Sequence, residues 1–103
     1  MEVKIIRGED TLECILSCEI DHHHAKQMRE CVDRALFAEK PRVLVLDFSA
    51  VPFMDSSGIA FVLGRASSAR TLGAEVCLRG LGRKERRLLA LSEIEKCPNI
   101  KVE

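Results

Sequence analysis

The feature that most constrains the fold is a short apolar strand signal followed closely by a helix-start signal. Val43 to Leu46 is an unbroken run of Val and Leu, typical of a strand covered on both faces or central in a parallel sheet. Asp55-Ser56-Ser57-Gly58 follows, and a helical pattern runs from Ile59 onward. An acidic residue, two hydroxyls and a glycine therefore stand where a helix should begin, which predicts a strand–loop–helix unit.

The rest of the chain repeats this alternation of strands and helices. Further strands are predicted at Val3 to Arg7, Thr11 to Ser17, Ala74 to Arg79 and Ile100 to Val102. Further helices are predicted between Asp21 and Pro41 and over Arg83 to Leu91. The turn at Gly8 to Asp10 suits an antiparallel hairpin between the first two strands. Strands that alternate with helices at this spacing indicate an α/β fold.

Helical periodicity predicts which side chains face the core. In the first helix, apolar residues recur at 3.6-residue spacing and charged residues, Asp33 among them, lie mostly opposite. We expect its core face to be Ala25, Met28, Val32, Ala35 and Leu36. The second helix has the stripe Ile59, Val62, Leu63 and Ala66. In the third, Leu88, Leu89 and Leu91 can face the core, with its basic residues outward.

Composition excludes several function classes. Lys plus Arg equals Asp plus Glu at 16 each, so the 103-residue chain has no net charge and no large electrostatic footprint for nucleic acid or an anionic membrane. With no Trp or Tyr and four Phe, it offers few platforms for base stacking. No stretch approaches the roughly 20 apolar residues of a membrane span. Five scattered cysteines without a signal peptide predict reduced thiols in a cytoplasmic protein.

The Asp55–Gly58 segment leaves three interpretations open for its serines. Side-chain oxygens at a helix start can accept the free backbone N–H groups of the first turn, which would make the segment a plain cap. The same N–H groups and the helix dipole favour an anion, which would suit a phosphate acceptor. A serine there could also be a nucleophile, although the G-x-S-x-G pattern of a nucleophile elbow is absent. The spacing alone favours capping.

A second polar cluster, His22-His23-His24 with Cys18, raises the question of a metal site. Three consecutive histidines point in different directions along a helix, and the spacing matches no established zinc pattern. We therefore predict no metal and no cofactor. We interpret these histidines as first-turn residues of a helix that Asp21 caps.

The residues Phe53-Met54-Asp55-Ser56-Ser57-Gly58-Ile59 resemble the signature of STAS-domain anti-sigma factor antagonists. Val62 to Arg65 extends the match, and Glu19-Ile20-Asp21-His22-His23 resembles the second signature of the family. The resemblance is greatest to the sporulation type, the antagonists of the anti-sigma F factor, and covers nearly the whole chain. It implies a single STAS domain over residues 1–103, with a small mixed sheet of four to five strands and helices packed mainly on one side.

The resemblance also implies a function and its residues. In this family the unphosphorylated antagonist binds an anti-sigma factor that is also a serine kinase, and so releases a sigma factor. Phosphorylation of the first serine of the motif, here Ser56, switches binding off, and a phosphoprotein phosphatase restores it. The chain would then be a kinase substrate and not an enzyme. The expected partner-binding residues are Glu19, Asp21, His22, Asp55, Ser56, Ser57, Gly58 and Ile59.

Three departures from the family pattern bear on the partner more than on the fold. Cys18 stands where the family usually has glycine, and Ser92-Glu93-Ile94 stands for S-G-L. The sequence ends after the last predicted strand, so we expect the family's usual final helix to be missing or truncated. Two other classes stay open: a non-switching STAS scaffold or nucleotide-binding module in a larger signalling or transport assembly, and a weak nucleotide hydrolase or serine hydrolase using the same loop.

Overall fold

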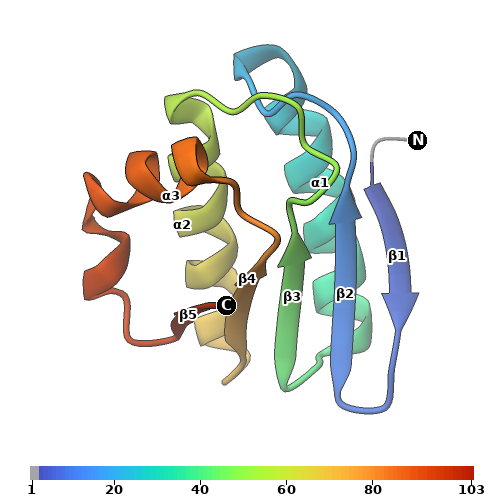
Figure 1. The fold of residues 1–103 in the computed structure, drawn as a ribbon. Coiled ribbons are helices and arrows are strands. Elements are labelled where there is room, and N and C mark those ends of the chain that lie inside the picture. Colours follow the sequence, from blue (N-terminus) through green and yellow to red (C-terminus); the bar gives the residue numbers. More distant parts are fainter. Residues whose placement is uncertain (1–2) are drawn as a thin grey trace.

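A five-stranded mixed sheet organises the computed structural model, which describes residues 3–103 and so leaves Met1 and Glu2 of the expected domain outside (Figure 1). Along the chain the elements are β1 (Val3–Arg7), β2 (Thr11–Leu16), α1 (His22–Glu39), β3 (Val43–Asp47), α2 (Ser56–Thr71), β4 (Glu75–Arg79), α3 (Arg83–Ala90), the 3₁₀ helix η1 (Glu93–Lys96) and β5 (Ile100–Val102). The α/β class and each predicted strand and helix are confirmed, with ends within a few residues.

The strands lie in sequence order, β1-β2-β3-β4-β5, and only the β1–β2 pair is antiparallel. Parallel crossover connections are right-handed. Because the strand order advances in one direction, successive crossovers place their helices on the same face. Figure 1 shows α1 and α2 together behind the sheet, with their first turns at the carboxyl ends of β2 and β3. The expectation of helices mainly on one side is confirmed.

The core lies between that face of the sheet and the two helices. Leu12, Cys14 and Leu16 of β2 are fully buried, as their alternation predicted. Four of the five predicted core residues of α1 are buried as well, and Ala25 is half-buried. Gly73 has φ +72°, a conformation that favours glycine, and it lies just after α2 ends at Thr71.

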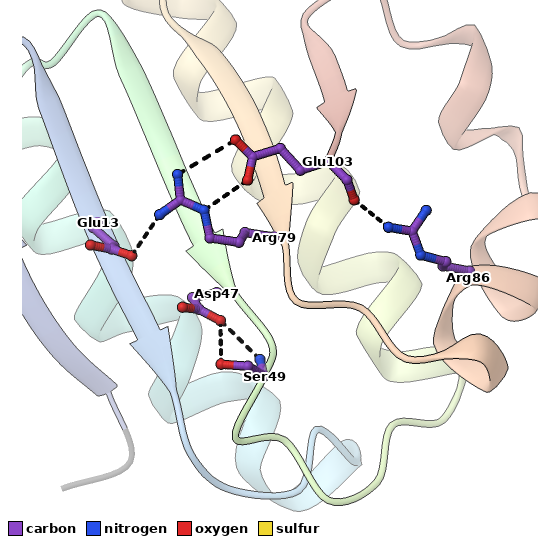
Figure 2. Close-up of polar contacts among 6 residues, drawn as sticks. All are labelled: Glu13, Asp47, Ser49, Arg79, Arg86 and Glu103. Atoms are coloured by element: carbon purple, nitrogen blue, oxygen red, sulfur yellow. Dashed lines mark hydrogen bonds and ion pairs between the residues drawn. The ribbon is translucent and has the colours of Figure 1, made fainter.

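The opposite face of the sheet carries a network of charged side chains (Figure 2). Arg79 on β4 lies 2.8 Å from Glu103 and 3.0 Å from Glu13 on β2, measured from guanidinium nitrogen to carboxylate oxygen. Asp47 accepts hydrogen bonds from the backbone N–H and the hydroxyl of Ser49. Hydrogen bonding to Glu103 raises the pKa of Arg79. This face is therefore chemically distinct from the apolar one.

Two predictions about side-chain orientation are wrong. Leu91 does not face the core and is 83% exposed, because α3 ends at Ala90 and Leu91 is its C-cap. The buried Ile94 of η1, only 2% exposed, packs into the core instead. Asp33 does not belong to the solvent-facing side of α1, because it pairs with a buried arginine of α2.

Candidate functional site

The two sequence signatures meet at the carboxyl edge of the sheet. Ile20 and Met54 form an isolated parallel bridge. The Ile20 N–H donates to the Phe53 carbonyl at 2.9 Å, and the Asp55 N–H donates to the Ile20 carbonyl at 3.1 Å. Asp21 and Asp55 each follow this bridge directly. The backbone therefore holds the first turns of α1 and α2 side by side.

Asp21 caps α1 as predicted. Its Oδ1 accepts from the His24 backbone N–H at 2.8 Å and lies 2.8 Å from Nδ1 of the His24 ring. The hydrogen bond from the His24 backbone is the main cause of the lowered pKa of Asp21, because hydrogen bonds to a carboxylate favour its charged form. The carboxylate of Asp21 is therefore engaged in capping α1.

Asp55 caps α2 in a tighter geometry. Its Oδ1 accepts from the Ser57 N–H at 2.8 Å, and its carbonyl accepts from the Gly58 N–H at 2.9 Å. Ser56 is the first helical residue, and its side chain is exposed. The capping interpretation therefore holds for Asp55. The Ser56 hydroxyl remains accessible at the positive end of a helix dipole, where an anion is stabilised.

Gly58 lets α2 begin in close contact with the bridge. It is buried, and a Cβ added there would overlap Cγ and Sδ of Met54. Met54 is itself only 6% exposed, so its side chain has little room to move. Because Gly58 has no side chain, the first turn of α2 can lie directly against Met54 of the bridge.

The remaining predicted site residues are distributed around these two turns. Glu19 and His22 are exposed, Ser57 is half-buried, and Ile59 is half-buried and packs against the core. A groove between the two helices brings His22, Lys26 and Arg29 of α1 together with Ser57, Phe61 and Arg65 of α2. His22 and Ser57 therefore share one surface, whereas Ile59 faces inward.

Sequence reasoning missed the arginine at the base of this groove. Arg65 is 4% exposed, and its Nε lies 2.7 Å from Oδ1 of Asp33 on α1. Its guanidinium also lies 5.4 Å from the centre of the Phe61 ring. A signal was present, because Phe61, Arg65 and Ala69 recur at helical spacing on the buried stripe of α2.

A scan against family models matches residues 5–102 to the STAS domain. This chain belongs to the STAS domain family. The anti-sigma F factor antagonist of Paenibacillus polymyxa is 33% identical over 96 residues, which cover 93% of this chain and 82% of the relative.

Solved structures of anti-sigma factor antagonists have the same fold. An anti-sigma factor antagonist from Mycobacterium paratuberculosis gives a TM-score of 0.76 at 25% identity, covering 95% of this chain and 82% of that chain. Phosphorylated SpoIIAA of Bacillus gives 0.73 at 24% identity, covering 98% and 90%. Unphosphorylated SpoIIAA gives 0.71 at 24% identity, covering 96% and 86%. At 24% identity the likeness to SpoIIAA is one of fold.

Three of the cysteines of this STAS domain, Cys14, Cys18 and Cys31, lie in the core or pack against it. None of the five cysteines, which all lie within residues 3–103, forms a disulfide, and burial raises the pKa of the Cys14 thiol to about 12, which keeps it protonated. Cys18, one of the departures from the family pattern, lies with its Sγ 3.6 Å from Sδ of Met28. Among the described side chains, which leave out Glu95, no group of three or more His, Cys, Asp or Glu is placed to hold a metal ion. Over residues 3–103, none of the helices is both long and apolar enough to cross a membrane.

Proposed function

We propose that this protein is an anti-sigma factor antagonist of the partner-switching type. In its unphosphorylated form it binds an anti-sigma factor that is also a serine kinase, and thereby releases a sigma factor in the cytoplasm. Phosphorylation of Ser56 switches this binding off, and a phosphoprotein phosphatase restores it. The protein is a binding partner and a kinase substrate, not a catalyst.

The observation that carries this proposal is the exposed Ser56 at the first position of α2. The cap comes from Asp55, so the Ser56 hydroxyl is not needed to begin the helix. Asp21, His22 and Glu19 lie on the neighbouring turn and segment, which the Ile20–Met54 bridge holds beside α2. A kinase can therefore reach the hydroxyl without unfolding the turn. The names of the curated relatives support the choice of partner.

Electrostatics gives the physical reason for the switch. A phosphate would add about −1.5 to −2 charges at neutral pH, next to Asp55 and near Asp21. The helix N-terminus stabilises that charge within the protein, so the fold need not change. In a docked complex, an unpaired buried charge costs about 2–5 kcal/mol, which weakens binding by about thirtyfold to several thousandfold.

The direct test is a binding measurement with the anti-sigma kinase from the same genome. We expect Ser56→Asp to weaken binding by at least about thirtyfold, while Ser56→Ala binds like the wild type. Ser67→Asp is the matched control, because Ser67 is exposed on the same helix but lies three turns from its start. Equal binding by the wild type, Ser56→Asp and Ser67→Asp would instead favour a non-switching STAS scaffold.

A further inference from the structure

A cationic groove lies between α1 and α2, beside the turn that carries Ser56. Its volume is about 340 Å³. The lining residues recur three or four positions apart on each helix, so two facing stripes form its walls. Ala25 and Ala60 are both part of this lining, and their small side chains leave the space between the stripes open. Ser57 lies at its end, immediately after the proposed phosphate acceptor.

The charges in the groove are not balanced. Lys26, Arg29 and Arg65 line it. Among the side chains that the structure describes, those of residues 3–103 apart from Glu95, the only carboxylate that forms an ion pair with any of these three is that of Asp33, which pairs with Arg65. Lys26 and Arg29 are exposed. This concentration of positive charge is local, because the chain as a whole has no net charge.

The burial of Arg65 makes this excess of positive charge energetically unfavourable. Burial lowers the pKa of the Arg65 guanidinium, Asp33 opposes that shift, and the positive charge of Arg29 adds to it. The like charges of Arg29 and Arg65 therefore lie close together, next to the buried ring of Phe61. An anionic group in the groove would relieve this repulsion, because it would lie within reach of several cations at once.

We propose that the groove receives an acidic segment of the anti-sigma factor, and this rests on the function proposed above. Charge complementarity selects the occupant: carboxylates of the partner would pair with Lys26 and Arg29. The proposal also gives a second reason why phosphorylation of Ser56 would weaken partner binding. A phosphate on Ser56 would lie near the Ser57 end of the groove, where it would repel an acidic segment and compete with it for the same cations.

Charge reversal at one groove position, with a matched control on the same helix, tests the proposal. We expect Arg29→Glu to weaken binding of the unphosphorylated protein to the anti-sigma kinase by about tenfold or more. The salt dependence of the affinity should fall as well. Arg34→Glu makes the same charge change at an exposed α1 position that lines a separate cavity against β1, and it should stay within about twofold of the wild type.

Three results would overturn the proposal, and they separate it from the function on which it rests. Equal binding by Arg29→Glu and Arg34→Glu, with Ser56 still phosphorylated in both, would reject the groove and keep the switch. A wild type that neither binds the kinase nor gains phosphate would reject both. ATP binding to the protein alone that Arg29→Glu abolishes, with partner affinity unchanged, would assign the groove to a nucleotide. Circular dichroism would establish that each variant is folded.

Discussion

The first turns of α1 and α2 share a bridge and an aspartate cap, but they differ in hydrogen bonding and in the side chains that they expose. Each helix begins after the Ile20–Met54 bridge with an aspartate as its N-cap. In α1 the cap accepts from the third helical residue, His24, and the helix opens with the Ala25 N–H bonded to the Asp21 carbonyl. In α2 the cap accepts from the second helical residue, and the Gly58 N–H bonds three residues back. The start of α2 is therefore tighter, in the manner of a 3₁₀ turn.

The side chains on the two turns account for the difference. In α1 the ring of His24 folds back on the Asp21 carboxylate, so this turn engages its own cap. In α2 the equivalent position is Gly58, which has no side chain and lies against Met54. The first position of α2 is the exposed Ser56. Capping and a role as phosphate acceptor are therefore compatible in this turn, because Asp55 caps the helix and Ser56 would accept the phosphate.

The largest stability effect is expected from filling the tight turn. Gly58→Ala places a methyl group into Met54, a buried side chain, and should lower the free energy of unfolding by about 1–2 kcal/mol. Gly64→Ala, in the same helix, has no atom within 4 Å of the added Cβ and should raise it by about 0.5–1 kcal/mol. Urea unfolding of both variants measures the contrast. A neutral or stabilising Gly58→Ala would mean that the turn is not closely packed.

Removing the cap of α2 should have a smaller effect. Asp55→Ala leaves the Ser57 N–H without its 2.8 Å acceptor and should lower the free energy of unfolding by about 1 kcal/mol. Asp55→Asn keeps an acceptor oxygen and should recover most of that loss. Thermal and urea unfolding provide the measurement. If Asp55→Ala were as stable as the wild type, the capping role assigned to Asp55 would be wrong.

The smallest effect is a pH dependence that belongs to the α1 cap. The pKa of Asp21 is lowered in the folded protein, so the unfolded chain takes up a proton first as the pH falls. Its stabilising contribution is therefore present above the ordinary carboxyl pKa of about 3.9 and is lost as the pH falls through the folded value. Asp21→Asn retains a capping oxygen but cannot titrate.

The measurement for this pair is the difference in unfolding midpoint between the wild type and Asp21→Asn. It should be larger at about pH 6 than at about pH 3, where the carboxylate is being protonated. A difference that does not change with pH would contradict the assignment of the lowered pKa to the cap.

Local signals in the sequence predicted most of the fold, since each depends on neighbours along the chain. Asp21 as a cap, the Gly8–Asp10 hairpin turn and the buried run at Val43 to Leu46 are of this kind. The Asp33–Arg65 pair could not be predicted in this way, because it depends on how α1 and α2 pack against each other. The orientation of Leu91 was predicted wrongly because α3 ends one residue earlier than expected, so Leu91 no longer follows the helical periodicity.

The same limit applied to the candidate site. The two signatures, Glu19 to His23 and Phe53 to Ile59, were both found in the sequence. Their contact through the Ile20–Met54 bridge joins residues more than thirty positions apart and became evident only in the structure. The cationic groove arises in the same way, from two helix faces that are each unremarkable alone.

Intact mass spectrometry after incubation with ATP and the anti-sigma kinase from the same genome tests the central claim most directly, with peptide mapping to locate any phosphate. We predict the gain of one phosphoryl group on Ser56, and no gain in Ser56→Ala. Phosphate on Ser57 or elsewhere, or no phosphate at all while the kinase binds the protein, would contradict the account and leave the α2 turn as a cap alone.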